Sequence, residues 1–480
     1  MNVEVAPVPC GESSSASLLH RIARGSTPAV VRRLFAAEAP LARQVWALAW
    51  PAIAHMLLVT LVFLVNRALL GRYSATALAS MQISGSLVWT IYSVFTASSA
   101  GTLAVVARSV GAGDREAAAK AARSSLLFAL GLGLVVVVPI LIANGALLRA
   151  LFPRAGAEVI ADSSAYLWIV LPFLPLAFLE AIAAASLQAA GDTRTPLYVA
   201  TAGNLIHIVL SSVLIFGHFG MPELGVRGAA IGMAATMAIE GMLLTAALLS
   251  KRSPLPVRSA PSRGSLSELA RVLRVSAPAF AEKLFYQSGY MGFVAIIGLL
   301  GAAAMAANQA LISIEAICFL SADGFGIAAG AIIAQKLGAK KVSEASRSGL
   351  IAAAMAVLLL TSFGLLFAAA PRALMLSFTD DAAIVDLGAR SLFVAAVAQP
   401  FMAFATVIGM GLRGAGDTKT VLGVTLVCSL GVRLAATWFF AVTLGMGLFG
   451  VWLGSTADWV VRSILLGIAY ARGGWRRVVV

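Results

Sequence analysis

The chain has 480 residues, of which 60% are hydrophobic and 12% are charged, and its formal net charge is +14. Soluble domains contain about 25% charged residues, so this composition excludes an ordinary soluble protein and indicates helices that cross a membrane many times. Basic residues in such a protein orient its loops, and we therefore expect no nucleic-acid partner. Cys10, Cys318 and Cys428 form no spaced pair, which excludes a disulfide framework or a cysteine metal site.

The first 40 residues are predicted to form a cytoplasmic N-terminal tail. The opening stretch lacks the apolar segment of a signal peptide. The basic stretch from Arg21 to Phe35 is a candidate for a short piece lying on the membrane surface, although Pro28 interrupts it.

Twelve apolar segments follow, each long enough to cross about 30 Å of hydrocarbon at about 1.5 Å of helix per residue. The connector between the sixth and seventh segments is rich in Pro, Ser and Arg, which is typical of a cytoplasmic linker. The predicted organisation is thus a tail (1–40), an N-terminal six-helix half (41–250), a linker (251–268) and a C-terminal six-helix half (269–475). The predicted spans are 45–66, 80–107, 123–145, 163–190, 197–217, 225–250, 272–298, 307–335, 348–370, 390–414, 420–444 and 448–471.

The distribution of basic residues predicts the orientation of these spans. With the N-terminus inside, the tail, the even-numbered loops and the C-terminus hold 25 of the 35 Lys and Arg residues. The opposite side holds seven, and three lie within spans. Such asymmetry favours a multi-pass protein of the plasma (inner) membrane with both termini in the cytoplasm.

The two halves are related in sequence. The eleven-residue stretches that follow the fourth and tenth spans share seven identical residues, and two further pairs of segments are shifted by 227 positions. Because each half has an even number of spans, the repeats enter the membrane in the same direction, an arrangement that places a transport path at the interface of the halves. The paired segments are LQAAGDTRTPL (Leu187 to Leu197) with LRGAGDTKTVL (Leu412 to Leu422), GRYSATALAS (Gly71 to Ser80) with GLLGAAAMAA (Gly298 to Ala307), and AVVARSVGAG (Ala104 to Gly113) with AIIAQKLGAK (Ala331 to Lys340).

These motifs resemble the multidrug and toxic compound extrusion (MATE) transporters of bacteria. The resemblance covers about residues 40–475 and includes the repeated GDT turn, the GLLGAAAMAANQ run, GNLIHIVLSSVLIFG in the fifth span and DWVVRSILL in the last. It implies an all-α protein of twelve transmembrane helices in two pseudo-symmetric six-helix bundles. It also implies export of bulky, often cationic compounds in exchange for Na⁺ or H⁺.

Carboxylates inside the spans are the candidates for binding a cation or a proton, because a charge at the bilayer centre is costly unless it faces a cavity or a partner. Glu180 lies about ten residues from the end of the fourth span, and Gln188 falls on the same helix face. Glu282 lies at a similar depth in the seventh span, where some members of the resembled family carry a functional glutamate. Alternatively, Glu180 is a hydrogen-bonded packing group, and the neighbouring Lys283 neutralises Glu282 as a structural ion pair.

The eighth span presents a polar stripe. Asn308 and Glu315 are seven residues apart and share a face, and Asp323 is eight residues further along. Glu315 matches a glutamate that many bacterial members of the resembled family carry. The alternative for Asp323 is a partner for a basic residue or a kink beside Gly324.

The N-terminal half departs from the resembled family. Asn66, His207 and Ser211 stand where members often have Asp, Asn and Asp, while Asn204 supplies a neighbouring amide. Asn66 and Ser211 can offer neutral oxygens to Na⁺ but cannot release a proton. His207 is either a proton-exchanging group or a hydrogen-bonded packing residue. We therefore expect ion coupling to shift to Glu180 and to the three acids of the C-terminal half.

Other charged residues are predicted to be structural. Arg433 in the eleventh span is expected to pair with an acid, and Asp458 with Arg462, which is four residues away on the same helix. Asp192 and Asp417 in the repeated turns are expected to cap the following helices.

The sequence contains no phosphate-binding GxxxxGK[ST] loop and no zinc or G-x-S-x-G motif. We therefore expect no enzyme activity, cofactor or metal beyond Na⁺, and transport driven by an ion gradient. The predicted function is a monomeric secondary antiporter of organic cationic or amphipathic compounds. A lipid-linked saccharide flippase of the same superfamily and a non-transporting membrane scaffold or sensor are the alternatives.

Overall fold

The computed structural model describes residues 28–153, 155–260 and 265–478. The chain divides into two units, residues 1–44 and 45–480, and the second contains all twelve predicted spans. The predictions for residues 1–27, including Cys10, lie outside the described residues, and the basic stretch from Arg21 is described only from Pro28 onward.

The N-terminal half is built from helices at every predicted span. Its second and fourth spans are each two helices joined by a 3-10 turn, Thr96–Ser98 and Leu171–Phe173. The second of these turns contains one proline and is followed by another, and proline cannot donate a helical hydrogen bond. The helices are α2 (Pro28–Tyr73), α3 (Ala75–Phe95), α4 (Ser99–Gly111), α5 (Arg115–Leu151), α6 (Ala157–Val170), α7 (Leu174–Ala189), α8 (Arg194–Phe216) and α9 (Val226–Leu249).

The C-terminal half repeats this plan with longer helices. Its eleventh span is continuous but includes two π-helical turns, Val427–Val432 and Phe439–Thr443, a local geometry that is frequent at functional sites. The helices are α10 (Ser265–Leu299), α11 (Ala302–Gly338), α12 (Val342–Ala369), α13 (Pro371–Leu376), α14 (Ala382–Gly414), α15 (Thr418–Leu426), α16 (Arg433–Trp438) and α17 (Gly447–Arg472).

Eleven helical segments of the described chain are long and apolar enough to cross a membrane. The remaining predicted span, the seventh, is α10, which has 35 residues but also carries Arg271, Arg274, Glu282 and Lys283, and these charges lower its hydropathy. The described residues contain no β-strand. The predicted all-α fold with twelve membrane-crossing helices is confirmed.

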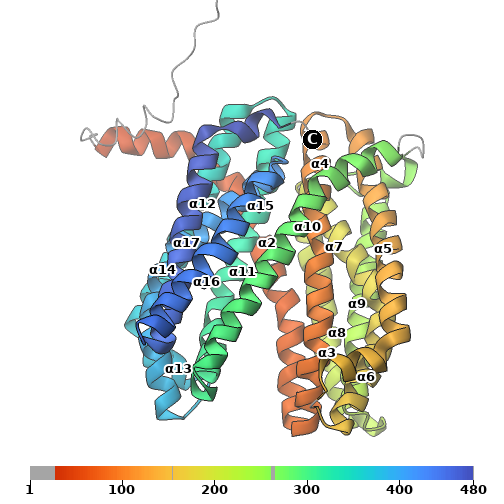
Figure 1. The fold of residues 1–480 in the computed structure, drawn as a ribbon. Helices are drawn as coiled ribbons and strands as arrows, with labels where there is room; N and C mark the ends of the chain where they lie inside the picture. The colour runs from red at the N-terminus through yellow and green to blue at the C-terminus, as the bar shows by residue number, and fades with distance from the viewer. Residues whose placement is uncertain (1–27, 154, 261–264, 479–480) are drawn as a thin grey trace, which may run out of the picture. The chain divides into compact units, whose positions relative to one another are not determined.

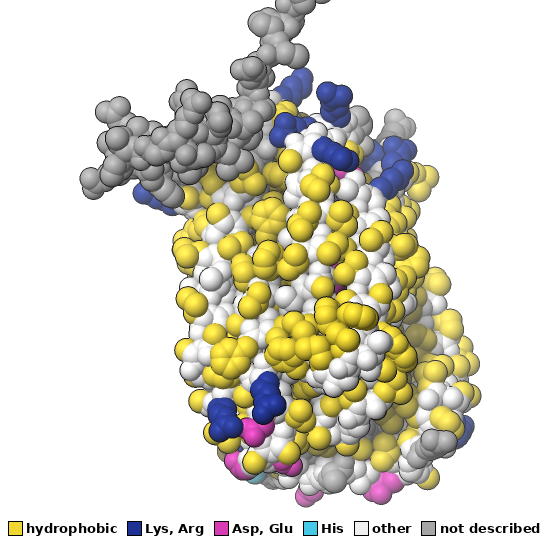
Figure 2. Space-filling model, turned by 60° about the vertical axis from the view of Figure 1, so that its left-hand side comes forward, with side chains coloured by type: hydrophobic (Ala, Val, Ile, Leu, Met, Phe, Trp, Pro, Cys, Tyr) yellow, Lys and Arg dark blue, Asp and Glu magenta, His cyan; other side chains and the backbone are white. Residues whose placement is uncertain are grey.

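The outer surface of these helices is apolar. Leu134, Val135 and Ile142 on α5 and Leu358 and Leu365 on α12 each expose half or more of their surface. Figure 2 shows hydrophobic side chains over the middle of the visible face, with charged side chains gathered toward its two ends. This is the surface that a surrounding bilayer requires.

Two hydrophobic cores lie inside the unit, one in each half. The N-terminal core includes Val62 and Leu70 of α2, and the C-terminal core includes Phe293 and Ile297 of α10. Both helices also reach the other core, because Val45 of α2 joins the C-terminal core and α10 enters the N-terminal core near its own start. In Figure 1, α10 accordingly runs diagonally between the two groups of helices.

The two halves are joined at one end of the helix bundle. This end carries the turns after α4, α7, α11 and α14 and the C-terminal segment, and it is here called the basic end. Arg108 of α4 donates hydrogen bonds to the carbonyls of Ala415 (3.4 Å) and Val478 (2.7 Å). Gly111 of α4 and Gly338 of α11 lie where these helices cross, and a Cβ on either glycine would overlap backbone of the opposite helix. Glycine therefore permits a close contact that closes the basic end.

Candidate functional site

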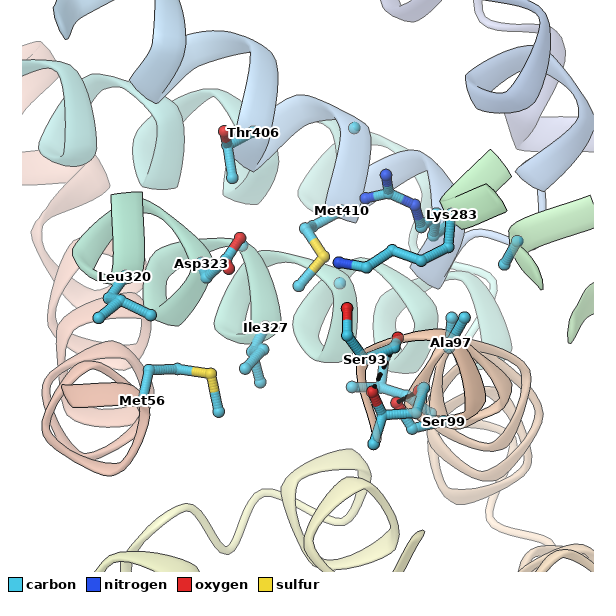
Figure 3. Close-up of a pocket in the computed structure, with 18 of the residues that line it drawn as sticks. Met56, Ser93, Ala97, Ser99, Lys283, Leu320, Asp323, Ile327, Thr406 and Met410 are labelled. Atoms are coloured by element: carbon cyan, nitrogen blue, oxygen red, sulfur yellow. Dashed lines mark hydrogen bonds between the residues drawn. The ribbon is translucent and has the colours of Figure 1, made fainter. Parts of the chain in front are cut away.

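A cavity of about 520 Å³ lies between the two halves. Residues of α2, α3, α4 and α7 line it from the N-terminal half, and residues of α10, α11, α14, α15 and α17 line it from the C-terminal half. Its walls are mainly apolar, as Met56, Leu320, Ile327 and Met410 illustrate (Figure 3). Acidic, basic and histidine side chains interrupt this surface: His55, Glu180, Glu282, Lys283, Asp323, Arg413 and Arg462.

The N-terminal wall of the cavity holds a buried carboxylate, Glu180. His55 Nε2 of α2 lies 3.5 Å from Glu180 Oε1, and the Tyr92 hydroxyl of α3 donates to Glu180 Oε2 at 3.3 Å. Gln188 lines the same cavity two turns along α7. Three helices therefore converge on one carboxylate, with an imidazole and a phenol hydroxyl beside it.

The C-terminal wall holds a second buried carboxylate, Glu282, in a different environment. Arg413 Nε and Nη2 of α14 donate to its two oxygens at 2.9 and 2.5 Å, and Thr425 Oγ1 adds a bond of 3.0 Å. This bidentate geometry is the strong form of an Arg–carboxylate pair. The partner of Glu282 is thus Arg413 and not the neighbouring Lys283.

A chain of buried charges continues from this pair into the C-terminal half. Arg462 Nη1 donates to Thr425 Oγ1 at 3.2 Å, and Arg462 Nη2 pairs with Asp458 at 3.0 Å. Asp458, fully buried, also receives Arg433 Nη2 at 2.6 Å. Both guanidinium groups lie within about 6 Å of the Trp459 ring, where cation–π attraction adds to their stabilisation.

Lys283 and Asp323 face the cavity without such partners. Neither forms an ion pair or a side-chain hydrogen bond with any described residue, although they lie near enough for electrostatic attraction. The ammonium of Lys283 lies 5.9 Å from the centre of the Tyr286 ring. In Figure 3 the side chain of Met410 lies between the ammonium and the carboxylate.

The remaining acids of the C-terminal half lie away from the cavity lining. Gln399 Nε2 donates to Glu315 Oε1 at 3.3 Å inside the half, and Asn308 is buried with its Oδ1 unbonded among the described residues. Asp323 alone of the predicted stripe on α11 lines the cavity. The stripe therefore divides between an internal site and the cavity wall.

The polar residues of the N-terminal interior also lie off the cavity lining. Asn66, Asn204, His207 and Ser211 are buried, and each has a side-chain nitrogen or oxygen without a hydrogen bond to a described residue. Glu240 of α9 is partly buried, has one carboxylate oxygen without a hydrogen bond to a described residue, and lies against Gly203. Within the described residues no three His, Cys, Asp or Glu side chains gather closely enough to hold a metal ion.

The repeated turns adopt one local structure in both halves. Gly191 and Gly416 have the same positive φ of 92°, which favours glycine after a helix C-terminus. Asp192 Oδ1 accepts from the backbone N–H groups of residues 194 and 195 at 3.1 and 3.0 Å. Asp417 Oδ1 accepts from the Thr420 N–H at 3.3 Å. Both aspartates therefore lie at the start of a helix, away from the cavity lining.

Sequence reasoning missed four residues of this site: His55, Tyr92, Arg413 and Thr425. Arg413 lies next to the repeated turn, where a basic residue is expected simply to set orientation. The signal that could have identified His55 is the repeat, because the 227-residue shift between the halves relates His55 to Glu282.

The MatE family model matches the chain twice, over residues 51–213 and 278–439, once in each half. The chain belongs to the MatE family. It is therefore a multi-pass membrane transporter of that family, which is a family of transporters and not of enzymes.

Named relatives of this MatE chain extend along most of its length. The probable multidrug resistance protein NorM of Thermotoga maritima is 29% identical over 433 residues, covering 90% of this chain and 92% of that protein. The uncharacterized transporter YisQ of Bacillus subtilis is 24% identical and covers 88% of this chain and 92% of that protein.

Solved MATE structures share the fold. A mutant of the Vibrio cholerae MATE transporter VcmN has a TM-score of 0.81 at 19% identity, covering 90% of this chain and 97% of that one. The eukaryotic MATE transporter AtDTX14 has a TM-score of 0.81 at 18% identity, covering 92% and 97%.

The two family matches also align the walls of the cavity. They start at Pro51 and Pro278, again 227 positions apart. In this alignment of the two halves, Glu282 is equivalent to His55. The shift of 225 at the repeated turn makes Arg413 equivalent to Gln188. The two walls of the MatE cavity therefore descend from one pattern but now carry different charges.

Proposed function

We propose that this chain is a multidrug-type secondary antiporter that exports organic, cationic or amphipathic compounds in exchange for Na⁺ or H⁺. Relatives named multidrug resistance proteins support the substrate class. The excess of basic residues at one end supports a plasma-membrane orientation with that end and both termini in the cytoplasm. We propose that the monomer is the working unit, because the cavity is lined by residues of one chain.

The observation that carries this proposal is the acid-bearing cavity between two halves joined at the basic end. The close α4–α11 contact at Gly111 and Gly338 supports a conformation that is closed toward that end. A substrate bound in the cavity would therefore leave toward the opposite side in this conformation. Rocking one half against the other would open the basic end in turn, as parallel-repeat transporters do.

The carboxylates of Glu180, Glu282 and Asp323 line the cavity, and we propose that Glu180 and Asp323 exchange a cation or proton with the substrate. Glu180 is best placed for a proton, because an imidazole lies beside it and no permanent cation pairs with it among the described residues. Glu282 is already neutralised by Arg413, so its proposed role is to hold α10 against α14 and α15.

Sites outside the cavity lining have separate proposed roles. Glu315 remains a proposed coupling residue inside the C-terminal half. Its hydrogen bond with Gln399 would make the position of α14 depend on the charge of Glu315. Asn66, Asn204 and Ser211 offer uncharged oxygens that suit Na⁺, and His207 beside them is the proposed proton-exchanging group of the N-terminal interior.

The test is transport by purified variants in vesicles with an imposed ion gradient. We expect Glu180→Gln to lose gradient-driven export while retaining substrate binding, and Asp323→Asn to lose gradient-driven export. Asp380→Asn, which alters an exposed acid outside the cavity, is the matched control. Normal coupling in the variants of all four acids, Glu180, Glu282, Glu315 and Asp323, would contradict the proposed coupling sites.

A further inference from the structure

The register of the two halves shows where the cavity has become asymmetric. Lys283 and Asp323 of the C-terminal wall correspond to Met56 and Thr96 of the N-terminal wall, and all four line the cavity. Figure 3 shows Met56 on α2 and Lys283 on α10 directed into the same space. A neutral pair on one wall is thus matched by an oppositely charged pair on the other.

These two charges differ from the other ionisable groups of the cavity. Arg413 and Arg462 are held by Glu282 and Asp458, and Glu180 is held by a histidine and a tyrosine. Lys283 and Asp323 have no ion pair or side-chain hydrogen bond with a described residue. Half-buried charges without partners are costly, and a ligand that supplies complementary charges recovers that cost.

The apolar surroundings define the rest of the ligand. Met410 lies between the two charges in Figure 3 and Met56 lines the facing wall, and methionine side chains adapt to varied shapes. Trp89 and Phe319 add flat aromatic surface to the lining. A ligand suited to this space is a flat amphiphile with a positive and a negative group on one edge.

We infer that Lys283 and Asp323 form a specificity pair that selects amphoteric amphiphiles, binding an anionic group at the ammonium and a cationic group at the carboxylate. This inference rests on the proposed export function and narrows its substrate class. Lys283, Arg413 and Arg462 all line the cavity. The cavity therefore carries more positive charge than the small number of basic residues within the predicted spans had indicated.

Rhodamine B and its methyl ester provide a matched probe pair, because both carry the xanthylium cation and only the free acid adds a carboxylate. Binding to purified full-length protein is measured by equilibrium dialysis, and comparing the acid-to-ester ratio of Kd values between variant and wild type cancels the partition of each dye into detergent. We expect Lys283→Met, which copies Met56 of the repeat, to weaken binding of the acid about ten-fold, as expected for losing one charge-assisted contact. Binding of the ester is expected to change less than about two-fold, because it lacks the anionic group.

Asp323→Thr, which copies Thr96, is expected to weaken both dyes about equally because both carry the cation. Lys419→Met, which removes an exposed charge in the first turn of α15, is the control and should leave both Kd values unchanged. Equal weakening of both dyes by Lys283→Met, or an unchanged acid-to-ester ratio, would overturn the inference. Selective binding of the acid without transport in liposomes would instead contradict the export function and leave the specificity pair standing.

Discussion

The Glu282–Arg413 pair provides a quantitative test of how the cavity wall is held. Removing one member of a buried ion pair costs about 3–5 kcal/mol, because the remaining charge is left without a partner. The Arg413 side chain is 22% exposed and that of Glu282 is 9% exposed. Partial hydration of Arg413 lowers the expected cost of Glu282→Gln or Arg413→Gln to about 2–3 kcal/mol.

The double variant separates pairing from other effects. If the two charges mainly stabilise one another, the variant with both substitutions should lose about 1–2 kcal/mol, well below the sum of the single losses. Each variant is heated in detergent at one fixed scan rate, and the fraction of protein that remains monodisperse is measured at each temperature. The midpoints rank the apparent stabilities of the variants. Asp386→Asn breaks an exposed pair with Arg372 and should change stability by less than about 1 kcal/mol.

Additive losses in the double variant would refute this reasoning. That outcome would mean that Glu282 and Arg413 act on stability independently, despite the bidentate contact. It would also return Glu282 to the set of carboxylates available for ion exchange.

Three further perturbations test other parts of the structure. Asp458→Asn leaves Arg433 and Arg462 without their shared carboxylate and should cost about 3–5 kcal/mol in the same unfolding assay; a wild-type transition would show that the cluster is not an ion-pair network. Asp192→Ala should cost about 1 kcal/mol through loss of a helix cap, with unchanged dye export, and abolished export in a stable variant would contradict a purely structural turn. Gly338→Val should push α11 from α4 and abolish export while membrane insertion stays normal; wild-type export would show that this crossing need not close.

The helices were predictable because their signal is local. Length and apolar composition locate each span, and the structure begins most of them at least one helical turn earlier than predicted. Even so, α10 has lower hydropathy than its neighbours, because Arg271, Arg274, Glu282 and Lys283 lie within it. The broken second and fourth spans were not predicted.

The candidate carboxylates were predictable, but their partners were not. Helical spacing places Asn308 and Glu315 on one face, yet it does not say whether that face lies inside a half or toward the cavity. The contact between Glu282 and Arg413 joins residues 131 positions apart. No periodicity within one helix reports such a contact, whereas alignment of the two halves would have identified His55.

The central claim is that an ion gradient drives export through this cavity. Its most direct test is transport of a cationic dye by purified protein in liposomes, under a Na⁺ gradient alone and then under a pH gradient alone. The account predicts uphill dye movement with at least one of these gradients, lost when that gradient is collapsed. Dye movement that never exceeds equilibration under either gradient, or that requires ATP, would contradict it.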